Sequence, residues 1–289
     1  MTLIPEWTEK DAAPFIYVPT ESDDKYSHGV LGMVTGSKRY PGAAILGVEA
    51  AHHAGIGMIR YFGPRSIARL VMVRRPEIVT VDGRVNAWLI GSGIDARHRT
   101  WREKRLMLRA LHSGLPVVVD AGALDLVTEA NGPTVITPHA RELARLLTSI
   151  KAERSMAYQS VESLTDAIVQ NPADWCEYAA DELGVVVLLK GHETHIAAPT
   201  NDAESRFHVT VTSPTTWLAT AGSGDVLAGI LGALVATMKS VEIASLGAIS
   251  ATAAWLHGKA ATLEEPAQPF PAGEISERVS ALVKRRASA

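Results

Sequence analysis

The chain has 289 residues, of which 47% are hydrophobic and 20% are charged, and its formal net charge at pH 7 is -3. This composition is typical of a globular protein with a large core, and it excludes the basic surface of a nucleic-acid-binding protein. The longest apolar run, residues 226–238, is too short to cross a membrane. The single cysteine, Cys176, excludes an internal disulfide, and the N-terminal segment lacks a secretory h-region. We therefore expect a cytoplasmic protein with neither nucleic-acid nor membrane partners.

Short β-branched runs alternate with longer helical patterns over the first two thirds of the chain. We expect strands at Val30–Thr35, Trp88–Gly91, Pro116–Asp120, Thr134–Thr137 and Val185–Lys190. We expect helices between them at Gly42–Gly55, Thr100–Ser113, His139–Leu147 and Asp174–Leu183. Several of the strands are apolar without alternation, which indicates that helices cover both of their faces.

The pattern changes after Gly191. The runs "THIAAP" and "FHVTVTS" predict an antiparallel hairpin at the edge of the sheet. Two helices rich in small residues follow at Ser223–Met238 and Val241–Ala261, and prolines then cluster around Glu264–Gly273, where we expect a frayed tail. This order predicts one domain over residues 1–289, a three-layer α/β/α sandwich with a mostly parallel central sheet.

Three common nucleotide and metal motifs are absent. The segment "GSKRYPGA" lacks the Lys-Ser/Thr of a P-loop, and "GIGMIR" and "GSGIDA" lack the third glycine of a dinucleotide-binding loop. In "HETH" only two residues separate His192 from His195, which is not the zinc-binding spacing. We expect no structural zinc, and we assign His52 and His53 to a helix flank without a chemical role.

The stretch "ATAGSGDVLAGILGAL" places one carboxylate, Asp225, at the start of an apolar helix. The first N–H groups of a helix lack partners within it and carry positive potential, so Gly222, Ser223 and Gly224 form a candidate anion site. An acid beside a bound phosphate can take a proton from a substrate hydroxyl. An Asp here can equally cap the helix, and the spacing leaves both interpretations open.

Other predicted strands also end in glycine or polar turns, in "GMVTGSKRYPGAAIL", "WLIGSGID", "VITPHARELARLL" and "VVLLKGHETHIA". In an open parallel sheet such turns meet at the carboxyl edge, where ligands bind. His139 and Lys190 would reach this edge together with Asp225. We interpret this convergence as an enzyme that acts on phosphates or nucleotides.

These motifs, in this order, resemble those of the ADP-dependent NAD(P)H-hydrate dehydratases. The resemblance runs from about His28 to Gly258, and its most specific elements are "TPHARE", "KGHET" and "ATAGSGDVLAG". It implies a ribokinase-like fold and a repair reaction, in which ADP phosphorylates the hydroxyl of hydrated NADH or NADPH and loss of phosphate restores the double bond. It also implies Mg²⁺ on the nucleotide phosphates, although the sequence offers no dedicated protein cage for this ion.

The resemblance further implies roles for individual residues. Asp225 would be the base that meets the hydroxyl of the hydrate. The backbone N–H groups that would hold the transferring phosphoryl group are those of Gly222, Ser223 and Gly224. The residues implied to bind ADP are Lys190, Gly191, His192, Glu193, Thr194 and Gly224. The residues implied to line the hydrate pocket are Ala43, Gly93, His139 and Asp225.

Three positions depart from the family's pattern. The segment Ser27-His28-Gly29 lacks a lysine, Ser223 stands where threonine is commoner, and Asp95 replaces the last glycine of a turn. We expect a carboxylate at 95 to repel a dinucleotide pyrophosphate unless it points away. No epimerase domain fits before residue 28, so we expect a separate NAD(P)H-hydrate epimerase as functional partner. The resemblance also implies a homo-oligomer such as a tetramer.

Two other functions stay open. A small-molecule kinase of the same fold, acting on a vitamin precursor, would use the same G-x-G-D site. A nucleotide-binding sensor without catalysis would fit the departures from the pattern, whereas the intact Lys190 and Asp225 argue against it. The sequence ranks neither NADH hydrate against NADPH hydrate nor ADP against ATP.

Overall fold

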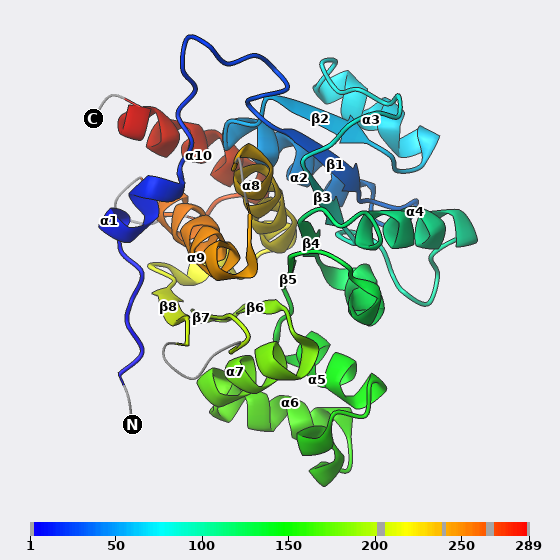
Figure 1. The fold of residues 1–289 in the computed structure, drawn as a ribbon, viewed down its shortest axis with the longest axis vertical. Helices are drawn as coiled ribbons and strands as arrows, with labels where there is room; N and C mark the ends of the chain where they lie inside the picture. Colours follow the sequence, from blue (N-terminus) through cyan, green and yellow to red (C-terminus); the bar gives the residue numbers. More distant parts are fainter. Residues whose placement is uncertain (1–2, 201–205, 239–240, 264–268, 288–289) are drawn as a thin grey trace.

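One eight-stranded sheet forms the centre of the computed structural model, which describes residues 3–200, 206–238, 241–263 and 269–287 (Figure 1). The strand order is β2-β1-β3-β4-β5-β6-β7-β8, with parallel pairing from β2 to β6 and antiparallel pairing for β7 and β8. The strands are β1 Val30–Val34, β2 Met58–Tyr61, β3 Ala87–Ile90, β4 Val117–Val119, β5 Thr134–Ile136, β6 Val186–Leu189, β7 Glu193–Ala197 and β8 His208–Thr212.

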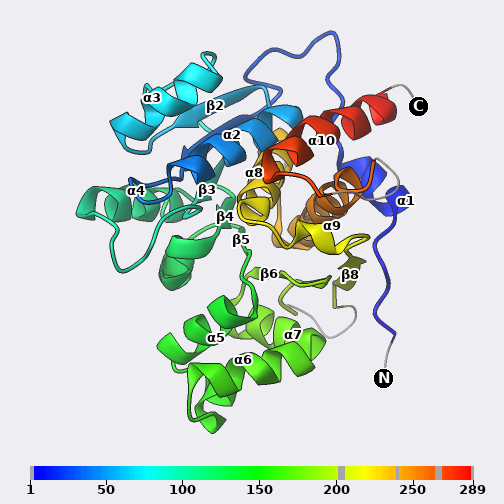
Figure 2. The ribbon, with the colours of Figure 1, turned by 180° about the vertical axis from the view of Figure 1, so that it is seen from behind.

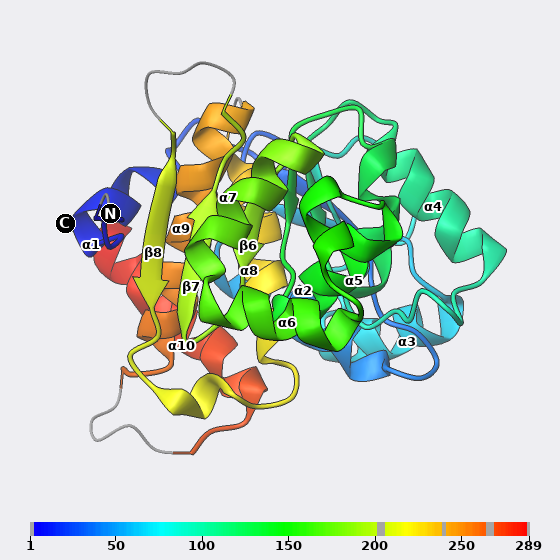
Figure 3. The same cartoon turned by 90° about the horizontal axis from the view of Figure 1, so that it is seen from below.

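Helices cover both faces of this sheet. They are α1 Glu9–Ala12, α2 Pro41–His53, α3 Arg65–Arg74, α4 Trp101–Leu111, α5 Ala140–Ser149, α6 Val161–Gln170, α7 Pro172–Leu183, α8 Ser223–Thr237, α9 Ile243–Ala260 and α10 Ala272–Ala287. One face packs against α2, α3, α8 and α9, with α10 outside these helices, and the other packs against α4 to α7. Figure 3 shows this division at β6 to β8, where α6 and α7 lie on one side and α9 on the other. The predicted three-layer sandwich is therefore confirmed.

Helix α8 is buried along almost its whole length because it lies between the sheet and a second helical layer. Helices α2 and α10 pack on its outer side (Figure 2). The crossing of α2 and α8 is so close that a Cβ on Gly229 would lie 2.3 Å from the carbonyl oxygen of Gly47. The small residues of this segment thus serve close helix packing, which fixes where the N-terminus of α8 meets the sheet.

A buried carboxylate joins α2 to α3. Glu49 accepts hydrogen bonds from Arg74 at 2.9 Å and from Arg75 at 2.8 and 2.6 Å. His53 lies 3.0 Å from Arg75 and bonds the hydroxyl of Ser280 in α10 at 2.8 Å. This network ties His53 to α10 and to the end of α3.

The five predicted strands and the edge hairpin are confirmed to within about two residues at each end. Strand β2 and the helices α1, α3, α6 and α10 were not predicted from the sequence. The prediction of a frayed tail around Glu264–Gly273 is wrong at its C-terminal end, because α10 already begins at Ala272. Residues 264–268 of the predicted tail lie outside the described part of the chain. Within the described ranges, no helix is both long enough and apolar enough to cross a membrane.

Candidate active site

The site is built around the first turn of α8. Gly222, the residue before the helix, has φ 90°, and a Cβ there would lie 2.4 Å from a methyl group of Leu46, so the turn requires glycine. The N–H of Ser223 donates to the carbonyl of Thr220 at 3.3 Å. In the described part of the chain, the N–H groups of Gly224 and Asp225 have no acceptor. Two unpaired donors at a helix N-terminus form an anion-binding site.

The carboxylate of Asp225 does not cap its helix, since the start of α8 has no side-chain cap hydrogen bond among the described residues. Asp225 is half-buried, and this burial raises the pKa of its carboxyl group to about 6, with the nearby charge of Asp120 adding to the rise and that of Lys190 opposing it. A carboxyl group that titrates near neutral pH is suited to general-base catalysis. The geometry therefore favours the catalytic interpretation over the capping one.

Lys190 brings a positive charge to the same helix end. Its Nζ lies 3.2 Å from Oδ1 of Asp120 and 3.8 Å from Oε2 of Glu142, and a Cβ on Gly224 would lie 3.6 Å from it. Burial disfavours the ammonium ion, but the charges of Asp120 and Glu142 outweigh this effect and raise the pKa of Lys190. Lys190 is therefore charged at neutral pH beside the two free N–H groups.

Asp120 is a central residue that the sequence analysis did not single out. It follows β4, is 3% exposed, and accepts hydrogen bonds from Ser92 at 2.9 Å, from Thr137 at 2.7 Å and from Lys190 at 3.2 Å. Its partners follow β3, β5 and β6, so one carboxylate joins the ends of four neighbouring strands. The only sequence signal was an acid directly after the wholly apolar run "VVV".

His139 precedes α5 and caps it. Its Nδ1 accepts from the N–H of Glu142 at 3.3 Å, and the carboxylate of Glu142 accepts from the N–H of His139 at 2.9 Å. Burial lowers the pKa of His139 although Glu142 acts in the opposite direction, so its imidazole is neutral at pH 7. The backbone of His139 also pairs with that of Lys190. The predicted neighbourhood of these two residues is thus present.

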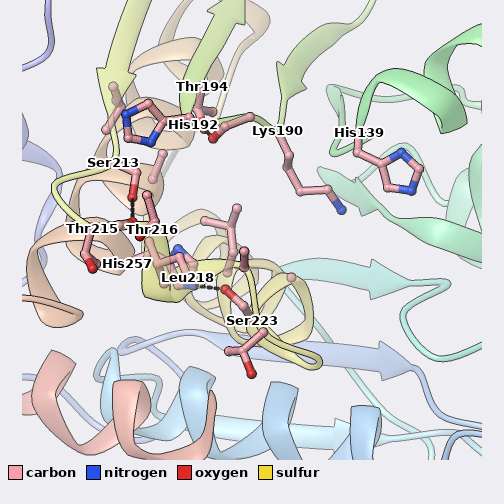
Figure 4. Close-up of a pocket in the computed structure, with 18 residues that line it drawn as sticks. His139, Lys190, His192, Thr194, Ser213, Thr215, Thr216, Leu218, Ser223 and His257 are labelled. Carbon is pink, nitrogen blue, oxygen red and sulfur yellow. Dashed lines mark hydrogen bonds between the residues drawn. The ribbon is translucent and has the colours of Figure 1, made fainter. Parts of the chain in front are cut away.

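A cavity of about 580 Å³ lies against Lys190 and the first turn of α8 (Figure 4). Most of the residues expected to bind ADP line this cavity, namely Lys190, Gly191, His192, Thr194 and Gly224. The carboxylate of Glu193 instead lies 3.6 Å from His195. A wall of the cavity that the sequence analysis missed comes from residues 213–220, after β8, and from α9.

Ser223 and His257 meet in the wall of this cavity. Figure 4 shows the hydroxyl of Ser223 pointing at the ring of His257, and Oγ lies 3.1 Å from Nε2. Both side chains are buried, and burial lowers the pKa of His257 to about 4. The imidazole is therefore neutral, and it fixes the hydroxyl of Ser223, the residue that stands where threonine is commoner.

The residues expected to line the hydrate pocket lie in two groups. Gly93 and Ala43 are in contact after β3 and at the start of α2, since a Cβ on Gly93 would lie 2.3 Å from that of Ala43. His139 and Asp225 lie near Lys190. A second hollow of about 520 Å³ is bordered by Tyr40, Ile94, Asp95 and Glu142, among others. Glu142 thus stands between this hollow and Lys190.

Comparison with known proteins shows the family of this chain. The family model described as NAD(P)H-hydrate dehydratase matches residues 31–278. The chain belongs to this family. It is 37% identical to a bifunctional NAD(P)H-hydrate repair enzyme from Mycobacterium leprae, over 94% of this chain and 53% of that protein. It is 31% identical to an ADP-dependent (S)-NAD(P)H-hydrate dehydratase from Neisseria meningitidis, over 90% of this chain and 85% of that one.

Solved structures confirm the fold of this NAD(P)H-hydrate dehydratase family member. An ADP/ATP-dependent NAD(P)H-hydrate dehydratase from Bacillus subtilis superposes with a TM-score of 0.82 at 24% identity, covering 99% of this chain and 100% of that one. A ribokinase-like superfamily protein from Enterococcus faecalis gives 0.79 at 21% identity, covering 99% and 97%. The fold is therefore ribokinase-like, as predicted. The chain spans about half the length of the curated relatives it matches first, 53% and 43%.

Asp95, the residue expected to repel a dinucleotide in this family's pocket, is surrounded by donors. Its carboxylate accepts from the N–H of Arg97 at 3.0 Å and lies 2.8 Å from Nδ1 of His98 and 3.9 Å from Arg39. The backbone bond from Arg97 and the contact with His98 lower the pKa of Asp95 to about 2. Its negative charge is thus balanced locally, which removes the reason for expecting repulsion.

Proposed function

We propose that the chain catalyses the ADP-dependent dehydration of NAD(P)H hydrate and so restores NAD(P)H. The observation that carries this proposal is the pairing of Asp225 with two free N–H groups and Lys190 at one helix end, in a member of the NAD(P)H-hydrate dehydratase family. The Neisseria meningitidis relative, named as ADP-dependent, supports the choice of nucleotide.

The chemistry follows from this arrangement in two steps. Asp225 takes the proton of the hydrate's hydroxyl as that oxygen attacks the β-phosphorus of ADP, and the bond to the bridging oxygen breaks to release AMP. The ring nitrogen then donates its electron pair as the carbon–oxygen bond breaks, phosphate leaves, and loss of a proton from the adjacent carbon forms the double bond. Hydroxide is a poor leaving group and phosphate a good one, so phosphorylation makes the elimination possible.

The chain's own residues stabilise the transferring phosphoryl group. The N–H groups of Gly224 and Asp225 and the ammonium of Lys190 converge on the place where its negative charge develops. Mg²⁺ on the nucleotide phosphates would neutralise part of their charge. Among the described residues no group of three or more His, Cys, Asp or Glu side chains suits a metal ion, so phosphate and water oxygens would supply most of its ligands.

The decisive experiment measures the return of the reduced-nicotinamide absorbance when the protein, ADP and Mg²⁺ are added to purified hydrate. Asp225→Asn keeps the shape of the side chain and removes the base, so turnover should be lost. Asp166→Asn is the matched control, since Asp166 is exposed in α6. Full activity of Asp225→Asn would contradict the role of this residue. A stable phosphorylated vitamin precursor formed from ATP, without action on the hydrate, would instead indicate a small-molecule kinase.

We also propose an epimerase as functional partner, because the Mycobacterium leprae relative is named a bifunctional NAD(P)H-hydrate repair enzyme. The reaction would take place in the cytoplasm, where its substrate is formed from free NAD(P)H, and the chain would act as one domain in a homo-oligomer. Light scattering of the purified protein measures the oligomeric state directly.

A further inference from the structure

A third hollow, of about 630 Å³, lies beyond the carboxyl ends of β1, β2 and β3. Its lining comes from the segments 37–39, 62–66, 94–95 and 98–106. The basic residues in this lining are Lys38, Arg39, Arg65, His98, Arg99 and Arg102, against the two acids Asp95 and Glu103. We call it the basic cavity. The comparisons and the chemistry proposed above assign it no role.

Three of its cations have no acidic partner among the described residues. Arg99 is bound by Asp125, and Arg39 lies near Asp95. The described part of the chain contains no hydrogen-bond or ion-pair partner for Lys38, Arg65 or Arg102, whose side chains are exposed.

The acids of the cavity are already engaged. Glu103 accepts hydrogen bonds from the N–H and hydroxyl of Thr100 at 2.6 and 2.9 Å, and Asp95 is held by Arg97 and His98. The cavity therefore has an excess of positive charge that nothing within the described chain neutralises, and such a concave surface concentrates anions.

The basic cavity borders the second hollow, which in turn borders the reaction site at Glu142. Ile94 and Asp95 line both it and the second hollow, which Glu142 separates from Lys190. Lys38 follows β1 and Lys190 follows β6, four strand spacings apart in the sheet order, which corresponds to about 19 Å. An extended dinucleotide with its nicotinamide near Asp225 covers a span of this kind.

We infer that the basic cavity binds the 2′-phosphate at the adenosine end of NADPH hydrate and makes it the preferred substrate over NADH hydrate. This inference rests on the proposed function and deepens it. The 2′-phosphate is the one chemical difference between the two hydrates, and a phosphomonoester dianion matches the charge of Lys38, Arg65 and Arg102. Arginine is suited to this task because its planar guanidinium binds two phosphate oxygens at once.

Steady-state kinetics with both hydrates test the inference. Arg65→Gln and Arg102→Gln should each lower the ratio of kcat/KM for NADPH hydrate to that for NADH hydrate by about tenfold, the effect of one charged hydrogen bond. The change should appear in KM. Arg69→Gln is the control, since Arg69 is exposed one turn further along α3 and does not line the cavity. Equal losses with both substrates, or no loss with either, would overturn the inference.

A binding measurement separates this inference from the proposed reaction. The cavity beside Lys190 and the first turn of α8 is first saturated with ADP and Mg²⁺. Calorimetry should then show tighter binding of adenosine 2′,5′-bisphosphate than of AMP. The difference should shrink about tenfold in Arg65→Gln and fall as KCl is raised. Equal affinity for the two probes would refute the role of the basic cavity. A protein that discriminates between the probes but converts neither hydrate would refute the proposed reaction instead.

Discussion

The substitution Asp225→Asn should make the protein inactive and, at pH 8, more stable. Burial raises the pKa of this carboxyl group from 3.8 to about 6. Each tenfold change in acid dissociation corresponds to about 1.4 kcal/mol, so the ionised carboxylate lowers the free energy of unfolding by about 3 kcal/mol at most. Asparagine has nearly the same shape and no charge, so the variant avoids this cost.

The pKa of Asp225 determines whether the free energy of unfolding rises or falls with pH. Below about pH 4 the carboxyl group is protonated in the folded and the unfolded chain, and its burial as an ion costs nothing. Between pH 4 and 6 the unfolded chain loses the proton first, so the free energy of unfolding falls as the pH rises, and above about pH 6 the loss is complete. Activity should follow the opposite course and rise through a midpoint near pH 6, because the ionised form is the base.

Urea unfolding of the parent and of Asp225→Asn at pH 4 and at pH 8 measures the effect. The difference in the free energy of unfolding should be small at pH 4 and approach about 3 kcal/mol in favour of the variant at pH 8. Asp166→Asn, on the exposed surface of α6, should leave the parent's pH profile unchanged. A variant that is less stable than the parent at pH 8 would refute the conclusion that Asp225 is a desolvated base.

Four further substitutions test the surroundings of this base. Lys190→Met removes the cation at the phosphoryl site and should lower kcat by about 100-fold or more. It also leaves the buried carboxylate of Asp120 without its cationic partner, so thermal unfolding should show a loss of about 3 kcal/mol. Asp120→Asn frees Lys190 to approach Asp225 and removes a negative charge, so the midpoint of the pH–rate profile should move below 6; an unchanged midpoint would contradict the coupling. His257→Ala and Ser223→Ala remove the two ends of one hydrogen bond, so their effects on kcat should not add in the double variant.

Much of the fold was predictable because the central strands are continuous apolar runs between helical segments. The run "VVLL" of β6 is short, rich in β-branched residues and followed by Gly191, and the runs of β7 and β8 alternate, so both patterns favour strands over helices. Strand β2 was missed because Arg60 interrupts its short apolar run, and this arginine reaches backbone carbonyls of the chain segment after α3. Helix α10 was missed because the prolines just before it masked its start.

The site was predictable where chemistry follows directly from local sequence. A glycine turn before an apolar helix indicated the anion site at Gly222–Asp225, and a cation at a strand end indicated Lys190. The residues that pair with Lys190 and with Ser223 could not be predicted in this way. Asp120 meets Lys190 across 70 residues of sequence and Ser223 meets His257 across 34. Only the sheet order and helix packing bring such pairs together.

The distribution of three charges explains why a lysine can stand beside a base without disabling it. A salt bridge between Lys190 and Asp225 would stabilise the carboxylate and lower its pKa, which would weaken it as a proton acceptor. In the structure the Lys190 ammonium instead forms an ion pair with Asp120, at 3.2 Å, and it influences Asp225 only by a longer-range electrostatic interaction. Asp120 therefore has two effects on Asp225: it holds the cation at a distance, and its own negative charge raises the pKa further. The same lysine stays close enough to Gly224 to meet a transferring phosphate.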